Sequence, residues 1–170
     1  FVAEGGFAIA RDGGGSPVKT QTQDRAVFSA PWGCSAIYAL RGYKSGTIVM
    51  GEDVHRLKGG TNGATRGLKA AFPDRVLGTP ISECAFAGLG GGLAMDGRYR
   101  PVVEFMYPDF MWVAGDQVFN QIGKARHMFG GDHPVPLVLR TKVAMGSGYG
   151  SQHLMDPAGI FATSPGWRIV

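Results

Sequence analysis

One carboxylate opens a long stretch of the sequence that carries no other charge. Glu83 follows Ser82, and residues 84–95 contain no charged side chain. A helix over this stretch is expected to be buried on all sides, with Glu83 at the edge of the core. Glu83 could instead have a purely structural role, as a first-turn acid after a Ser82 cap whose interaction with the helix dipole stabilises the helix by up to about 1 kcal/mol. Composition alone favours this structural role.

Candidates for proton transfer and metal binding are few outside this stretch. The histidines are His55, His127, His133 and His153. Their spacing builds no zinc site, and the acidic pair Glu52 and Asp53 lacks the companions that a hard cation needs. We therefore expect no metal ligands on this chain and a solvated strand end at Glu52. His153 closes a glycine-rich loop, where an exposed histidine can exchange protons near neutral pH, although the residues alone favour an ordinary surface role.

Glycines inside the uncharged stretch invite a phosphate-binding interpretation. The run Gly-Leu-Gly-Gly-Gly-Leu occupies residues 88–93. A dinucleotide fingerprint needs its glycines in the turn between a strand and a helix, and here they lie within the apolar stretch itself. Each glycine inside a helix costs about 1 kcal/mol relative to alanine. We therefore favour close packing against a second helix, of this chain or of another subunit.

Composition places the chain among ordinary globular domains. It has 170 residues, of which 44% are hydrophobic and 28 are glycine, with a net charge of +4. Lysine and arginine are scattered rather than clustered, which argues against nucleic-acid binding. No apolar stretch reaches the roughly 20 residues of a membrane span. Cys34 and Cys84 lack paired spacing, which favours free thiols in a reducing compartment, the cytoplasm or the mitochondrial matrix of a eukaryote.

Short strands alternate with helices along most of the chain. Strands are expected at 47–50, 75–77, 101–106, 135–140 and 167–170, and helices at 64–72, 84–95, 108–129 and 156–161. In the third helix, the apolar spacing predicts a core face with Phe110, Val113, Ala114, Val118, Ile122 and Ala125. Such alternation predicts an α/β fold with three layers, α/β/α, around a mostly parallel sheet.

The same pattern predicts where a ligand would bind. Residues 1–45 are poorly readable, so the domain is expected over residues 46–170. Ligands of parallel sheets gather at the carboxyl ends of the strands. This rule selects Glu83, residues 106–110 and the loop that leads to His153 as parts of one site.

Several segments, in this order, resemble the β subunit of the thiamine-diphosphate-dependent decarboxylating component of 2-oxo acid dehydrogenase complexes. They are Gly-Glu-Asp-Val at 51–54, Thr-Pro-Ile-Ser-Glu at 79–83, Arg-Pro-Val-Val-Glu-Phe at 100–105, Asp-Gln-Val at 116–118, Gln-His at 152–153 and Ser-Pro-Gly-Trp-Arg-Ile-Val at 164–170. The resemblance implies a transketolase-like pyrimidine-binding domain. The family's C-terminal domain does not follow, and the chain begins with Phe1, so a fragment of a longer protein is expected.

The resemblance also assigns roles to single residues. It implies that Glu83 hydrogen-bonds the aminopyrimidine ring of thiamine diphosphate and takes part in its activation, which requires a carboxyl able to exchange a proton near neutral pH. Met106 and Phe110 would line the aminopyrimidine pocket, and His153 would lie near the site of acyl transfer. Two positions depart from the family pattern: Gly78 replaces a common aspartate, and Val113 stands where some relatives have a polar pocket residue.

Partners follow from what the sequence lacks. The chain has no Gly-Asp-Gly and downstream Asn pattern, so the resemblance implies that an alpha subunit holds the diphosphate and Mg²⁺. The expected assembly is an alpha2-beta2 heterotetramer that decarboxylates a 2-oxo acid and passes the acyl group to a lipoyl acyltransferase core. Two alternatives stay open. One is an acetoin dehydrogenase or another transketolase-like thiamine enzyme, and the other is a noncatalytic subunit-contact module of the same fold.

Overall fold

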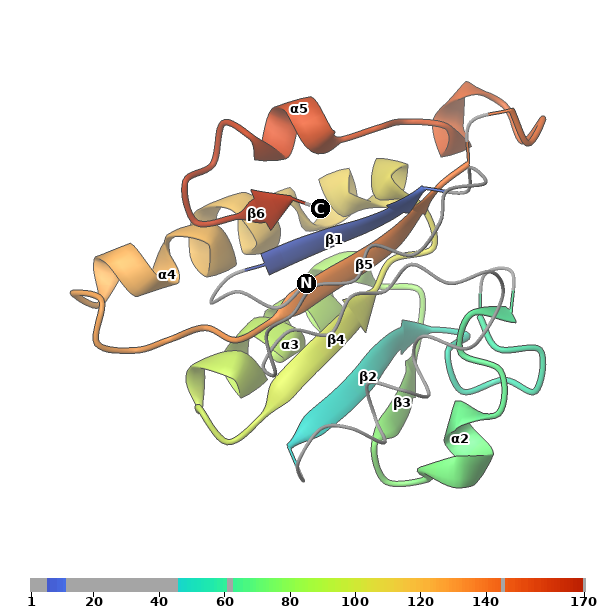
Figure 1. Ribbon diagram of the computed structural model, residues 1–170, viewed down its shortest axis with the longest axis horizontal. Helices are drawn as coiled ribbons and strands as arrows, with labels where there is room; N and C mark the ends of the chain where they lie inside the picture. The colour runs from blue at the N-terminus through green and yellow to red at the C-terminus, as the bar shows by residue number, and fades with distance from the viewer. Residues whose placement is uncertain (1–5, 12–45, 61–62, 145, 170) are drawn as a thin grey trace, which may run out of the picture.

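A single parallel sheet organises the protein. The computed structural model describes residues 6–11, 46–60, 63–144 and 146–169, and its six strands have the order β3-β2-β4-β5-β1-β6 (Figure 1). The strands are β1 (Gly6–Arg11), β2 (Thr47–Glu52), β3 (Val76–Thr79), β4 (Arg100–Glu104), β5 (Val138–Val143) and β6 (Arg168–Ile169). Every pairing between them is parallel, so the expected α/β class is confirmed.

Helices cover the two faces of this sheet. On one face, α3 (Glu83–Met95) packs through Phe86 on Met50 and Val103, in a core that α5 (Ala158–Phe161) also joins. On the other face, α2 (Leu68–Ala71) packs through Leu68 against alternate residues of β2 and β3. Alternation of side chains along each strand sends neighbouring residues to opposite faces, which explains the two cores.

The order in which successive strands are added to the sheet reverses direction after β3. From β2 it passes through α2 to β3, and from β3 it returns through α3 to β4 on the other side of β2. The carboxyl ends of β2 and β4 therefore form a topological switch point, the place where ligands bind in open α/β sheets. Glu52 ends β2, and Glu104 ends β4.

Glycines allow α3 to lie close to its neighbours. A Cβ at Gly90 would lie 2.5 Å from Val103 Cγ2 on β4, and one at Gly91 would lie 2.7 Å from Ile122 Cγ1 in the next helix. Close packing against a second helix is thus confirmed within the chain. The prediction that α3 is buried on all sides is wrong, because neither the sheet nor the next helix reaches the face with Leu89, which is 52% exposed.

A long helix starts at Pro108, as predicted, and changes pitch along its length. A 3₁₀ segment, η2 (Pro108–Ala114), leads into a π segment, η3 (Asp116–Ile122), and then α4 (Gly123–Met128). With three residues per turn, η2 buries Met111 and leaves Val113 61% exposed. The predicted core position of Val113 is therefore wrong. Gly130 and Gly131 follow the end of α4 with φ of 72° and 88°, the left-handed conformation with which glycine commonly ends a helix.

Other differences from the prediction concern where the elements begin and end. The helix expected at 64–72 shrinks to α2, because Gly67 has φ of 78° and interrupts the turn before it. Strand β1 lies in the segment that could not be interpreted. Three predictions lie outside the described residues: the loop that Gly-Gly-Gly-Ser-Pro predicts at residues 13–17, the free thiol of Cys34 and the end of the last strand at Val170. Within the part that the structure describes, no helix is long and apolar enough to cross a membrane.

Candidate functional site

Glu83 is the first residue of α3 and is almost fully buried. Its exposed fraction is 7%. Ser82 occupies the N-cap position but makes no side-chain capping hydrogen bond. Among the described residues, no hydrogen bond or ion pair reaches the Glu83 carboxyl. The Glu83 carboxyl is therefore not fixed by a hydrogen bond or an ion pair within the described part of the chain.

A second acid, Glu52, lies near Glu83. Burial is the main cause that raises the pKa of Glu52, and the negative charges of Asp53 and Glu83 add to it, while Arg56 acts in the opposite direction. Glu52 is half-buried, so the solvated strand end expected from the sequence is not found. Strand alternation could have revealed this, because Met50 and Glu52 point to the same face of the sheet as α3.

His153 lies in a second cluster, built from aromatic rings. Its ring centroid is 5.0 Å from Tyr107, 5.3 Å from Phe110 and 6.3 Å from Tyr149. Tyr107 and Phe110 also contact each other edge to face at 6.0 Å. The His153 Nδ1 atom is buried and has no hydrogen-bond partner among the described residues. The structure therefore brings two of the predicted residues, Phe110 and His153, into direct contact.

Two side-chain contacts hold the segment after His153 against η2. The backbone N–H of Met155 donates to Asp109 Oδ2 at 3.3 Å, and the indole N–H of Trp112 lies 3.2 Å from the Met155 sulfur. Because both partners belong to η2, they position His153, which ends η4 (Ser151–His153), beside Phe110. Neither contact was expected from the sequence, since they join residues more than forty positions apart.

The predicted site residues thus form two groups at the carboxyl side of the sheet. Glu83 lies near Glu52 in one group, and Phe110 contacts His153 in the other. Met106 is half-exposed between the end of β4 and η2. No hydrogen bond, ion pair or ring contact among the described residues joins the two groups. The Glu83 carboxyl, which makes no described hydrogen bond, and the buried, unpartnered His153 Nδ1 are each able to hydrogen-bond a ligand.

Both departures from the family pattern have a structural counterpart. A Cβ at Gly78 would collide with the imidazole of His55, so His55 takes the space that a side chain at position 78 would need. Val113 points largely to solvent. Position 78 lies on β3, shortly before the segment that leads to Glu83. The rim of this site therefore carries the His55 imidazole where a side chain at position 78 would otherwise lie.

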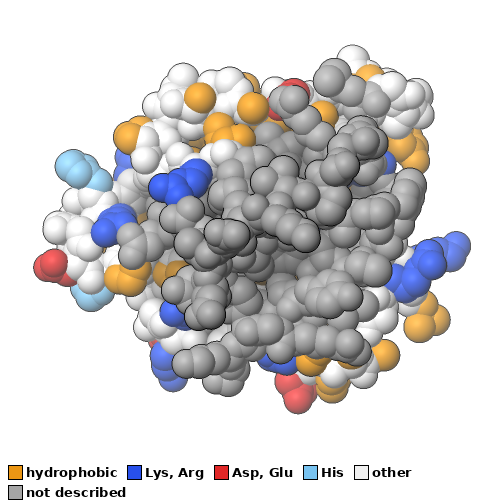
Figure 2. Space-filling model, in the orientation of Figure 1, with side chains coloured by type: hydrophobic (Ala, Val, Ile, Leu, Met, Phe, Trp, Pro, Cys, Tyr) orange, Lys and Arg blue, Asp and Glu red, His pale blue; other side chains and the backbone are white. Residues whose placement is uncertain are grey.

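Charges elsewhere are either paired or dispersed. Arg140 of β5 forms a buried ion pair with Glu104 of β4, with the two side chains 18% and 3% exposed. On the face shown in Figure 2, the described lysines and arginines are spread around the periphery. Within the ranges that the structure describes, no group of three or more His, Cys, Asp or Glu side chains could hold a metal ion.

Comparison with known proteins gives a consistent result. The family described as transketolase, pyrimidine binding domain, matches residues 35–170. The β subunit of an acetoin:2,6-dichlorophenolindophenol oxidoreductase from Cupriavidus necator is 44% identical over 72% of this chain and 39% of its own length. A 2-oxoisovalerate dehydrogenase subunit beta from Bacillus subtilis is 39% identical over 74% of this chain and 38% of its own length. A pyruvate dehydrogenase E1 component subunit beta from Staphylococcus epidermidis is 39% identical over 72% of this chain and 38% of its own length. The chain therefore spans well under half the length of these relatives.

Proposed function

Because this chain belongs to the transketolase pyrimidine-binding domain family, we propose that it forms the pyrimidine side of a thiamine-diphosphate site in a β subunit that acts on 2-oxo acids. The observation that carries this proposal is the position of Glu83, a 7% exposed residue in the first turn of α3 whose carboxyl makes no hydrogen bond or ion pair with the described residues. Its position near a topological switch point is the expected one for a ligand contact. The similarity to β subunits of 2-oxo acid dehydrogenases supports the same conclusion.

The residues of the two groups suit different parts of this task. Thiamine diphosphate, when bound, supplies the electron sink for cleaving a bond next to a carbonyl group. Glu83 would hold a proton at its carboxyl and exchange it with a pyrimidine ring nitrogen. Met106 and Phe110 would offer soft and flat apolar surfaces to the ring. His153 would serve proton transfer on the substrate side, close to the acyl group that leaves.

The rest of the proposed site belongs to another chain. The described residues contain no cluster that could hold Mg²⁺, and the relatives are named as β subunits. We propose that an alpha subunit binds the diphosphate and Mg²⁺ within an alpha2-beta2 heterotetramer, and that a lipoyl acyltransferase core accepts the acyl group. This assembly would work in the cytoplasm, or in the mitochondrial matrix of a eukaryotic cell.

Acetoin cleavage is the second candidate. It is favoured by one observation, the 44% identity to an acetoin:2,6-dichlorophenolindophenol oxidoreductase subunit beta. Both reactions break a carbon–carbon bond next to a carbonyl group, so they make the same demand on Glu83. They differ in the group that leaves, carbon dioxide in one case and acetaldehyde in the other.

The test is a Glu83→Gln variant in the complete protein, purified from its own cells with the chains that accompany it. Reduction of 2,6-dichlorophenolindophenol is measured with 2-oxo acids and with acetoin as substrates. We expect Glu83→Gln to lower the rate at least a hundredfold, the order that a general acid–base group contributes (~10²–10⁴). Assembly, followed by size-exclusion chromatography, should stay intact.

Asp96→Asn is the matched control, because Asp96 is an exposed acid at the opposite end of α3. It should keep full activity. Full activity of Glu83→Gln would disprove the catalytic assignment. An unsubstituted complex that assembles but turns over neither substrate class would favour the noncatalytic subunit-contact module, and turnover of acetoin alone would favour the second candidate.

A further inference from the structure

A glycine-rich loop leads from β5 to His153 and carries one aromatic side chain, Tyr149. Residues 146–152 are Gly-Ser-Gly-Tyr-Gly-Ser-Gln. Gly146, Gly148 and Gly150 have φ of 80°, 79° and 90°, and a Cβ at any of them would meet nothing within 4 Å. The described residues therefore pack little against the backbone of this loop, and its position depends on its side-chain contacts, those of Tyr149 within the loop and those of His153 and Met155 at its end.

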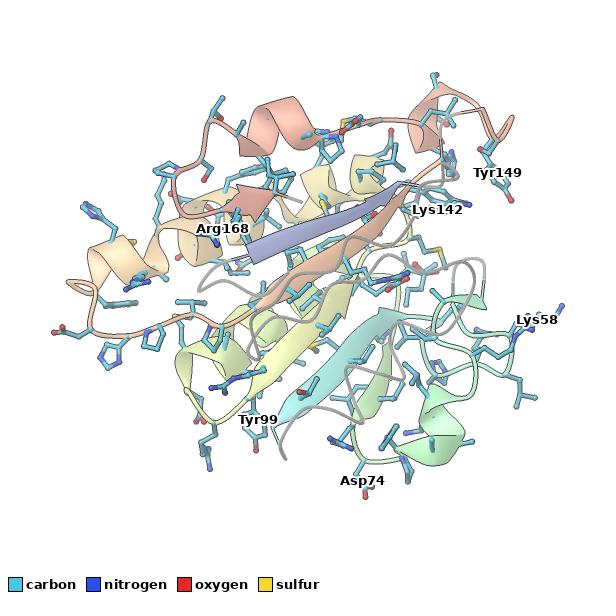
Figure 3. The ribbon with its side chains drawn as sticks, in the orientation of Figure 1. Lys58, Asp74, Tyr99, Lys142, Tyr149 and Arg168 are labelled. Carbon is cyan, nitrogen blue, oxygen red and sulfur yellow. The ribbon has the colours of Figure 1, made fainter. Side chains whose placement is uncertain are left out.

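Tyr149 contacts the buried side of the aromatic cluster. Its ring centroid lies 5.9 Å from Tyr107 and 6.3 Å from His153. Tyr107 is fixed, since it is only 8% exposed and contacts both Phe110 and His153. Tyr149 itself is 57% exposed, so it spans from the core to the surface. Figure 3 shows it at the carboxyl end of the sheet, with Tyr99 at the opposite end.

The two phenol groups lie close enough for Tyr149 to affect the pKa of Tyr107. The pKa of Tyr107 is raised, first by burial and then by the neighbouring Tyr149 phenol, through its charge and a side-chain hydrogen bond. Within residues 146–152, the side chain with described ring contacts to the aromatic cluster is thus Tyr149.

We propose that Tyr149 is a positioning residue for His153: by packing against Tyr107 it holds the glycine-rich loop in one place, so that His153 keeps one orientation toward the substrate. This inference rests on the proposed function for the role of His153. Tyr149 does not react. It lowers the number of conformations that the loop and His153 would otherwise sample, which is the usual advantage of preorganisation.

Two measurements on the complete complex test the proposal. The first is amide hydrogen exchange of residues 146–153. In Tyr149→Ala these amides should exchange about three- to tenfold faster, the range that corresponds to the loss of an aromatic pair. Tyr149→Phe keeps the ring and should recover most of the protection. Tyr99→Ala, a tyrosine at the amino end of β4, is the matched control and should leave this loop unchanged.

The second measurement is a double-mutant cycle on kcat with His153→Ala. If Tyr149 acts through His153, the double variant should be no slower than His153→Ala alone. Additive losses would overturn the proposal, as would unchanged loop exchange in Tyr149→Ala or a loss of protection in Tyr149→Phe as large as that in Tyr149→Ala. Hydrogen exchange needs no turnover, so failure of the proposed function would appear as absent activity in every variant while the exchange result still decides the role of Tyr149.

Discussion

Glu52 and Glu83 are two acids that repel each other at the carboxyl end of β2. The charge of Glu83 is one of the causes that raise the pKa of Glu52, after burial and the charge of Asp53. Such pairs are uncommon outside functional sites, because the fold must tolerate their repulsion. The pair therefore supports the view that this end of the sheet is organised for chemistry rather than for stability.

The Glu52 carboxyl should make stability depend on pH in a defined direction. Its folded pKa lies above the ordinary value of 4.5, so the folded state binds the proton more tightly than the unfolded state does. The contribution of Glu52 to stability is then fully present below pH 4.5 and is lost as pH rises from there through the folded pKa. Glu52→Gln removes this loss. Denaturant unfolding at several pH values should show the variant more stable than the unsubstituted protein at neutral pH, and a constant difference at all pH values would contradict the assignment.

Gly90 and Gly92 should respond in opposite ways to alanine. A methyl group at position 90 would meet Val103, whereas one at position 92 would meet nothing within 4 Å. We expect Gly90→Ala to lower the free energy of unfolding by about 1–3 kcal/mol, as overpacked cores do. Gly92→Ala should raise it by up to about 1 kcal/mol, because alanine is the better helix former. Thermal unfolding of the two variants provides the comparison, and a neutral Gly90→Ala would mean that α3 lies farther from β4.

A side chain at position 78 should displace His55. Gly78→Ala brings a methyl group onto the His55 imidazole, but His55 is exposed and free to rotate away. We expect a loss of less than about 1 kcal/mol, within the range of surface substitutions. In a His55→Ala background that loss should vanish, and a double-mutant cycle of unfolding free energies measures it. Equal losses in both backgrounds would place the cause in the backbone of β3 instead.

Arg140 should be needed to compensate Glu104. Both side chains are largely buried between β4 and β5. Arg140→Met leaves an uncompensated charge and should cost about 3–5 kcal/mol, whereas removal of both charges by Glu104→Gln with Arg140→Met should cost less. Denaturant unfolding distinguishes the two cases. If the double variant is as unstable as the single one, the packing of Arg140 matters more than its charge.

Local patterns predicted much of this fold. The uncharged stretch predicted α3, and Pro108 predicted the start of the long helix. Glycine marks the end of that helix. Hydrophobic periodicity and the proline and glycine residues that begin or end an element involve only residues close in the chain, so they can be read from the sequence. Strand β1 was missed because Gly6–Arg11 is weak in β-branched residues and becomes a strand through pairing with β5 and β6.

The candidate site was predicted only in part. Glu83 was selected by its isolation in the sequence, and Phe110 and His153 lie together as one site requires. Glu52 was assigned to a solvated strand end, because its nearness to Glu83 arises from how α3 packs on β2. Val113 was assigned to the core since a period of 3.6 residues was assumed, and a 3₁₀ segment turns that residue outward. The pitch of the 3₁₀ segment could not be read from the sequence, whereas strand alternation would have placed Glu52 on the same face as Met50.

Strand β1 has a consequence for the order in which the protein folds. Gly6 pairs with Val138 on one side and with Arg168 on the other. During synthesis β1 leaves the ribosome long before β5 and β6 are made. Until then its backbone N–H and C=O groups form hydrogen bonds with water or temporary contacts with other segments. β2, β3 and β4 can assemble around α3 in the meantime, since they are close in the chain. β1 would then be inserted late, between strands that are made near the end of this segment, and this step is where the nascent chain would depend most on chaperones.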